Sequence, residues 1–257
     1  MLNRIVSIAK NAFREAVRDR VLYNLVLFVL LLVGCAVLLG DLTDGHEART
    51  IVNIGLNAML LFGVFISIFV GIGLVSKEIE KRTVFAIFAK PVDRGEFIIG
   101  KYLGLCLTLA INVVVMGLGV SLALLFVGGG HLAGSIWGSI VLIFFELSII
   151  TAVAILFSSF SSPALSALLT FLIFVIGHFS SSLRDLAENL GSESAKFFFN
   201  AVYYALPNLS HFTFVTNATY GDVPPLTMIA GGFVYALVVN VILLAATILI
   251  FSRRNFK

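Results

Sequence analysis

Six long apolar runs separate short polar segments along this chain, and they constrain its fold more than any other feature. The runs are Val21–Leu39, Ile54–Val75, Tyr102–Val127, Ile136–Phe157, Leu165–Phe179 and Leu226–Phe251. A helix needs roughly 20 apolar residues to cross the hydrocarbon layer of a bilayer, and the fifth run is shorter than this. Charged residues make up 12% of the chain, about half the fraction found in soluble domains. The sequence therefore predicts an all-α integral membrane protein with six transmembrane helices.

The distribution of lysine and arginine predicts which side each polar segment occupies. Six spans place both termini on one side, and an inner N-terminus puts 14 of the 17 Lys and Arg residues there. Positive residues are retained on the cytoplasmic side. We therefore expect a multi-pass protein of the cell inner (cytoplasmic) membrane, with both termini cytoplasmic. The net charge of +3 reflects this topology and does not indicate nucleic-acid binding.

Residues 1–20 precede the six-helix domain of residues 21–257 and have the pattern of an amphipathic helix. Apolar residues, including Phe13, recur at helical spacing on one face, and Lys10, Arg14 and Arg18 recur four residues apart on the other. A helix of this kind lies on the membrane surface against anionic headgroups. The alternative is a simple basic flank to the first span.

The longest segment outside the spans is residues 180–225. Its second half contains the run KFFFNAVYYALPNLSHF, which is rich in aromatic residues, and aromatic rings with polar tips favour the membrane interface. We expect one or two short outer helices here that lie on or dip into the outer leaflet and are broken at Pro207. The alternative is a folded outer cap.

The longest charged island, Ser76–Lys101, lies between the second and third spans and would be cytoplasmic. Val84, Ile87 and Phe88 have helical spacing. A helix containing them should end before Pro91, because the residue that precedes a proline is biased away from helix.

A second helix should follow directly in the island. Asp93, with Glu96 three residues later, resembles a capping box, and the helix that it starts would continue through Phe97 into the third span. The island is therefore predicted to be a stiff helix–turn–helix elbow, able to carry force from a partner protein into two spans.

The island also contains a near match to a phosphate-binding loop. The segment from Gly95 to Tyr102 fits the spacing GxxxxGK, but tyrosine stands where a magnesium-binding Ser or Thr is needed. Because it follows no predicted strand and enters a span, we expect it to bind no nucleotide. No cofactor is expected to bind this chain.

The island resembles the signature of the type-2 ABC exporter permeases. In that family an acidic pair and an Arg/Gly-Thr step precede a short apolar helix, a Lys-Pro or similar pair, an Arg and a final Gly-Lys. The matching positions are Glu78, Glu80, Arg82, Thr83, Lys90, Pro91, Arg94, Glu96, Gly100 and Lys101. The subgroup that the chain most resembles includes the permease of the nitrous-oxide reductase maturation transporter.

The resemblance implies a permease that forms a dimer, most simply a homodimer, and docks one ABC ATPase subunit per copy. ATP and Mg would then bind that separate subunit, so the chain would not be an enzyme by itself. The island would act as the coupling helix, and the outer helices before the last span would line or cap the exit. Because the chain has no extra soluble domain, the resemblance leaves the transported substrate open.

Glu146 is the only Asp, Glu, Lys or Arg residue inside an apolar run. An ionisable group in a span usually faces protein or a wet cavity, so Glu146 is a candidate contact on the translocation path. The alternative is a hydrogen bond to a Ser or Thr of a neighbouring helix. A different class of function, a secondary transporter that uses Glu146 as its ion or proton site, also stays open. The four histidines are dispersed without metal-ligand spacing, so no metal site is expected.

Overall fold

The computed structural model describes residues 2–17, 27–28, 31, 34, 46–80, 93–180, 182 and 193–253. This part of the chain is helical and contains no strand, which confirms the all-α class. The helices are α1 (Leu2–Ala16), α3 (Glu47–Glu80), α5 (Arg94–Phe126), α6 (Gly130–Ala133), α7 (Ile136–Ser158), α8 (Pro163–His178), α10 (Glu193–Ala205), η2 (Leu209–Phe212), α11 (Val215–Thr219) and α12 (Leu226–Arg253).

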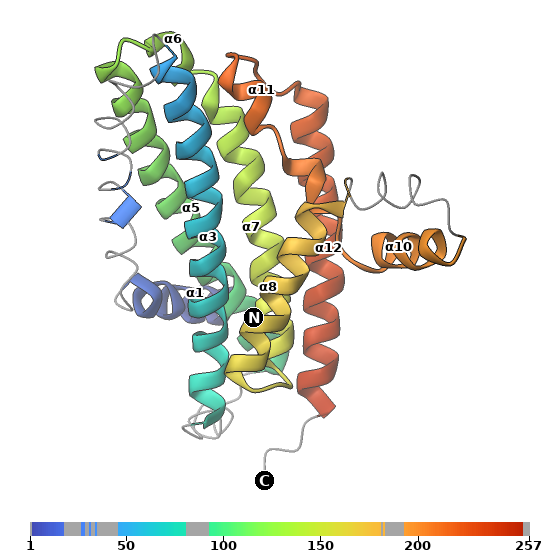
Figure 1. The fold of residues 1–257 in the computed structure, drawn as a ribbon. Coiled ribbons are helices and arrows are strands. Elements are labelled where there is room, and N and C mark those ends of the chain that lie inside the picture. The colour runs from blue at the N-terminus through green and yellow to red at the C-terminus, as the bar shows by residue number, and fades with distance from the viewer. Residues whose placement is uncertain are drawn as a thin grey trace.

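The long helices α3, α5, α7 and α12 run side by side with α8 as one bundle (Figure 1). The four long ones are each apolar enough to cross a membrane. Their apolar faces meet in one main core, in which Leu56, Leu109 and Ile150 are fully buried. The first expected span, Val21–Leu39, falls almost wholly outside the described residues, so the count of six spans stays a prediction.

Helix α8 is the short member of the bundle. It begins at Pro163, which occupies the first turn, where a missing N–H costs no intrahelical bond. It ends at His178 after 16 residues, so it is about 24 Å long at 1.5 Å per residue. That length is less than the thickness of the hydrocarbon layer, which is about 30 Å. Helix α8 therefore ends before it spans the full length of the bundle.

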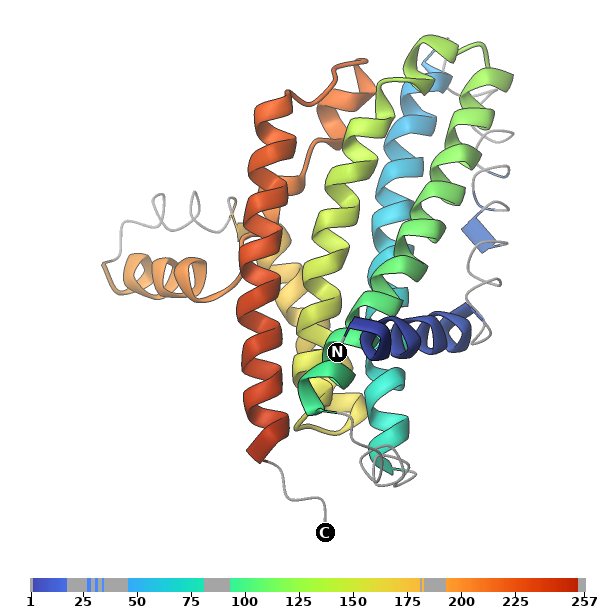
Figure 2. The same ribbon diagram turned by 180° about the vertical axis from the view of Figure 1, so that it is seen from behind.

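Helix α1 lies across the bundle and packs on α5 (Figure 2). Gly100 and Gly104 permit this contact: a Cβ at Gly104 would lie 2.5 Å from the Ala9 carbonyl oxygen and 2.7 Å from the Ala12 Cβ. Helix α1 covers most of the segment expected to form the amphipathic helix, and in it Ala12 is buried and Lys10 is exposed. Its apolar face contacts protein at α5, while its place at the membrane surface stays a prediction.

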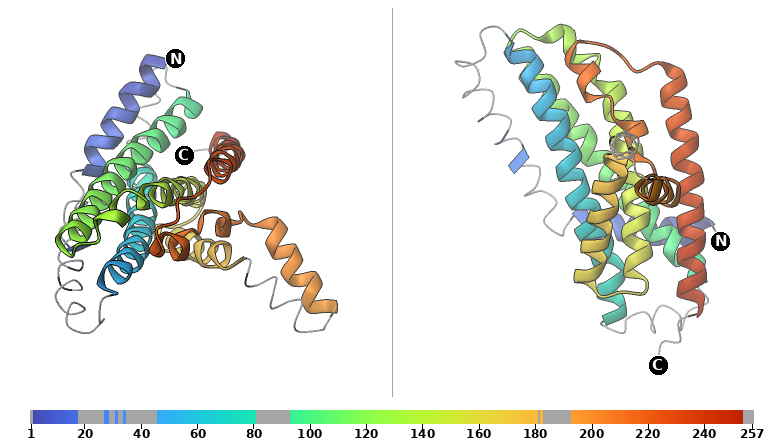
Figure 3. Two further views of the ribbon diagram at one scale, coloured as in Figure 1. Left: turned by 90° about the horizontal axis from the view of Figure 1, so that it is seen from above. Right: turned by 45° about the vertical axis from the view of Figure 1, so that its right-hand side comes forward.

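The segment 180–225 contains short helices, and the chain is non-helical at Pro207, as expected. Helix α10 projects from the side of the bundle, away from α1 (Figure 3). The aromatic side chains of Phe197 and Tyr204 are each 79% exposed. After Pro207 the chain returns to the bundle as η2 and α11, which pack on α7, α8 and α3.

Candidate functional site

The described half of the charged island is the beginning of α5. Asp93 caps the helix with its side chain, and the Glu96 side chain accepts a hydrogen bond from the Asp93 backbone N–H at 3.4 Å. This is the capping box that the sequence predicts. Residues Gly95 to Lys101 are continuous helix within α5, so the segment that matches GxxxxGK has the backbone of a helix and not of a phosphate-binding loop.

The beginning of α5 is joined to the end of α12. The Arg94 guanidinium donates hydrogen bonds to the backbone carbonyls of Phe251 at 3.0 Å and Ser252 at 2.6 Å. These carbonyls lie in the last turn of α12, where carbonyl groups lack intrahelical partners and a cation is favoured. The ring of Phe97 stacks on that of Phe251 with 6.0 Å between centroids. The two helix ends are thus held together by both polar and apolar contacts.

The same part of α5 is also joined to α1. Lys101, only 4% exposed, donates to the Glu15 carboxylate at 3.2 Å. Arg4 forms an ion pair of 3.8 Å with Glu96, which is itself buried. The helix α1 therefore contacts α5 through two ion pairs and the glycine surface described above. We call Arg94, Glu96, Phe97 and Lys101, with their partners on α1 and α12, the inner junction.

The sequence-based coupling residues divide into two groups. Arg94, Glu96 and Lys101 belong to the inner junction, and Gly100 lies beside them against α1. The side chains of Glu78 and Glu80 at the end of α3, and residues Arg82, Thr83, Lys90 and Pro91, lie outside the described part of the structure, as does Arg18 of the N-terminal segment. Their contact with an ATPase stays a prediction.

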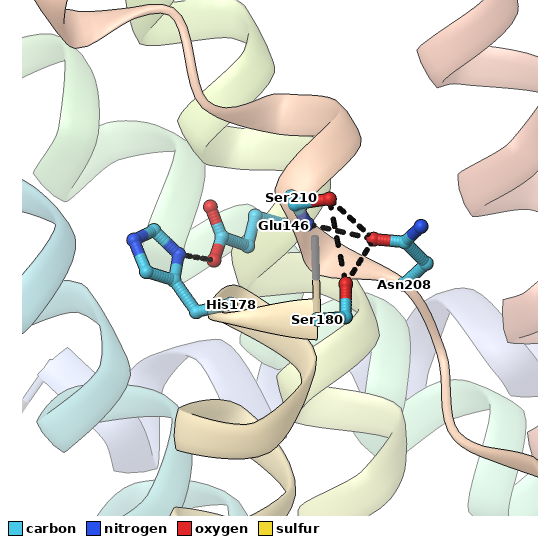
Figure 4. Close-up of polar contacts among 5 residues, drawn as sticks. All are labelled: Glu146, His178, Ser180, Asn208 and Ser210. Atoms are coloured by element: carbon cyan, nitrogen blue, oxygen red, sulfur yellow. Dashed lines mark hydrogen bonds and ion pairs between the residues drawn. The ribbon is translucent and has the colours of Figure 1, made fainter. Parts of the chain in front are cut away.

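A second polar group lies inside the bundle, where α8 ends (Figure 4). The Glu146 carboxylate on α7 is 2.9 Å from His178 Nδ1 on α8. The Glu146 side chain is 1% exposed and that of His178 is 19% exposed. Phe174 and Phe179 pack beside the imidazole, with ring centroids 5.5 and 5.4 Å away. The partner of Glu146 is thus a histidine, and not the serine or threonine of the alternative interpretation.

A cluster around Asn208 holds the chain where it leaves and returns to the bundle. The Asn208 carboxamide oxygen accepts hydrogen bonds from the hydroxyls of Ser180 at 2.5 Å and Ser210 at 2.6 Å (Figure 4). Its backbone N–H donates to the Tyr235 hydroxyl of α12 at 2.7 Å. Gly177 lets the returning chain approach closely, because a Cβ there would lie 2.7 Å from the Pro207 carbonyl oxygen. We call Ser180, Asn208 and Ser210 the clasp.

A hollow of about 340 Å³ opens between α3 and the beginning of α8. Its lining is mostly apolar and includes Phe69, Ile72 and Pro163. The Ser76 hydroxyl also lines it and has no hydrogen-bond partner among the described residues. The hollow thus lies near the beginning of α8, and His178 lies at its end. Helix α8 packs beside α3.

Sequence reasoning missed two parts of this arrangement. It did not pair Glu146 with His178, because these residues are 32 positions apart in the sequence. It also predicted no contact for Asn208 and Ser210, which lie in the segment 180–225. Within the described residues, no group of three or more His, Cys, Asp and Glu side chains could hold a metal ion.

The comparisons with known proteins bear on the whole chain. The sequence model of the family described as ABC-2 family transporter protein matches residues 6–256. No curated protein matches the chain. The match covers the bundle, both polar groups and α10, so the inner junction and the end of α8 both belong to the matched region.

Proposed function

Because the chain belongs to the ABC-2 transporter family and is a permease subunit of an ABC transporter, we propose that it couples ATP hydrolysis by a separate ATPase chain to export across the cytoplasmic membrane. Two copies of the chain would form the pathway. The ATPase would supply the bound ATP and Mg, so this chain would perform no chemical step. The alternative class, a secondary transporter driven through Glu146, is not favoured by membership of this family.

The observation that carries the proposal is the inner junction. A force applied to the island reaches Asp93 and the beginning of α5, which contacts both α1 and the last turn of α12. A bonded and packed contact transmits displacement because protein interiors deform little. Movement of the island would therefore displace α5, α1 and α12 together, as a coupling element requires.

The hollow between α3 and α8 supports the transport part of the proposal. It lies beside the first turn of α8, which follows the polar turn of residues 159–162. This is the same end of the bundle as the inner junction (Figure 1). The positive-inside distribution supports a cytoplasmic position for this end. An apolar hollow at this end would accept an amphipathic or apolar molecule from the cytoplasmic side before the pathway changes its access.

The test is recovery of the ATPase with the tagged permease from its native membrane. Charge reversal at Glu78, Glu80 and Arg82 should reduce the recovered ATPase at least tenfold, because these charges would form the docking surface. The matched control is Glu47→Lys, at the opposite end of α3, which should leave recovery unchanged. Full recovery of the ATPase with the triple variant would reject the coupling role of the island.

A further inference from the structure

The end of α8 presents a ring nitrogen, His178 Nε2, to which the described part of the chain forms no hydrogen bond. His178 Nδ1 contacts Glu146, while Nε2 has no hydrogen-bond partner among the described residues. In Figure 4 this second nitrogen points away from Glu146. The carboxylate fixes the orientation of the ring, as carboxylates do for histidines that bind metals or transfer protons. The pair therefore holds Nε2 in a defined direction.

Electroneutrality determines which hydrogen-bonding role Nε2 has. A net charge is costly inside a membrane, so the neutral form of the Glu146–His178 pair is favoured. That form is either an imidazolium beside a carboxylate or a neutral imidazole beside a carboxylic acid. In the first form both ring nitrogens carry a hydrogen, and in the second form Nε2 carries it when the carboxylic acid donates its own proton to Nδ1, which is the arrangement that the proposal requires. Nε2 is therefore a hydrogen-bond donor.

Within the described ranges, no second ionisable group contacts this pair. Helix α3 has no ionisable side chain between Thr50 and Ser76. His211 of η2 is within hydrogen-bond distance of Asn208, and Tyr235 of α12 accepts from the Asn208 backbone. The donor at Nε2 is thus isolated among the described residues.

The described neighbours of the imidazole are mainly aromatic, since Phe174 and Phe179 pack beside it. A molecule that reaches Nε2 must place one acceptor group there and apolar groups around it. An unpaired donor in an apolar site also rejects molecules that lack the acceptor.

We propose that His178 Nε2, positioned by Glu146, binds the acceptor group of a transported amphiphile, such as a phosphate or carboxylate attached to an aliphatic tail. This assignment rests on the proposed function, because it names the substrate class of the permease. His178 is the binding residue, and Glu146 is a positioning residue that keeps Nε2 protonated and aimed.

The test is nitrogen NMR of the full chain, labelled with ¹⁵N-histidine and placed in phosphatidylcholine nanodiscs. The Nε2 resonance is assigned as the one lost in the double variant Glu146→Met, His178→Phe. We expect Nε2 to carry a hydrogen at neutral pH and its resonance to move when dodecyl phosphate is added. Dodecyltrimethylammonium, which has the same tail and no acceptor, should not move it. The exposed His131 in α6 provides an internal control.

Two results would overturn the proposal. One is a non-protonated Nε2 at neutral pH, and the other is an equal response, or none, to the two amphiphiles. Repeating the experiment in phosphatidylglycerol nanodiscs identifies the source of the acceptor. A shift caused by this lipid alone makes a resident lipid the ligand, whereas a shift that needs dodecyl phosphate makes an added amphiphile the ligand. Both of these outcomes support the proposal that Nε2 binds the acceptor group of an amphiphile.

A second measurement uses the complex with its ATPase. In the double variant, the dodecyl phosphate concentration that half-maximally stimulates ATP hydrolysis should rise about tenfold, as expected for loss of one hydrogen bond to a charged group. An unchanged concentration would also reject the proposal. If no ATPase is recovered, the proposed function fails, while the nanodisc titration still decides whether His178 binds the acceptor.

Discussion

The two polar regions of this protein differ in what they leave unpaired. At the inner junction, Arg94, Glu96 and Lys101 all contact groups on α1, on α12 or in the cap of α5. At the end of α8, by contrast, the Glu146–His178 pair leaves one ring nitrogen without a partner among the described residues. The comparison teaches that the polar groups of the inner junction connect helices to one another, whereas His178 Nε2, which points away from Glu146, is available to a ligand.

The sharpest way to break this comparison is to remove one member of the Glu146–His178 pair. His178→Phe leaves a fully buried carboxyl group without its partner, and loss of one partner of a buried pair costs about 3–5 kcal/mol. The double variant Glu146→Met, His178→Phe removes both polar groups and should recover most of that loss. Unfolding in mixed micelles measures both variants. A double variant as unstable as the single one would mean that the pair serves mainly to stabilise the bundle.

The contact between α1 and α5 is tested by adding one methyl group. Gly104→Ala would force a Cβ against Ala9 and Ala12, and overpacking of this kind costs about 1–3 kcal/mol. Gly119→Ala on the same helix is the matched control, since the nearest atom to its Cβ would be 4.0 Å away. Because alanine favours helix over glycine by about 0.5–1 kcal/mol, the control should be neutral or stabilised. Equal effects on thermal stability would show that α1 does not pack as described.

The link between α5 and α12 is tested at Arg94. Arg94→Gln shortens the donor and removes its charge from the two carbonyls at the end of α12, at a cost of about 1 kcal/mol. Hydrogen exchange should then quicken about fivefold in the last turn of α12. Arg94→Lys keeps a charge but loses the forked geometry, so its effect should be intermediate. Unchanged exchange in both variants would remove this link from the inner junction.

The smallest effect is expected on the exposed face of α1. Anionic lipid should stabilise the protein through Lys10 and Arg14, and the double variant Lys10→Gln, Arg14→Gln should reduce this stabilisation by no more than about 1 kcal/mol per residue. The stabilisation is the difference in unfolding free energy between phosphatidylglycerol and phosphatidylcholine nanodiscs, and added salt should abolish it. The control is Lys196→Gln on α10. A lipid preference unaffected by the α1 variants would place this face away from the headgroups.

Local signals in the sequence predicted the long helices and the cap of α5 well. The apolar runs identified the long helices, because their length and composition alone satisfy the bilayer. The capping box at Asp93 and Glu96 is formed by residues three apart, so no knowledge of the fold was needed. The contact of Arg94 with α12 joins residues 157 and 158 positions apart, and nothing in the local pattern indicates it.

The end of α8 was harder to predict because its geometry depends on where a helix stops. Glu146 was identified as unusual, since it is the one acidic residue in an apolar run. Its pairing with His178 depends on α8 ending inside the bundle, which in turn depends on how Gly177 and Pro207 meet. Residues far apart in sequence decide that contact, so the sequence indicated a polar site but not its partner.

The clasp has a consequence for how the protein could be remodelled. Ser180 and Asn208 hydrogen bond directly, so the chain between them departs from and rejoins the bundle at a single point. Closure entropy grows only slowly with loop length, by about 0.6 kcal/mol per doubling, and inserted domains are tolerated where two ends meet. The stretch that bears α10 is therefore a natural graft position, at which another module can be exchanged while the bundle keeps its architecture.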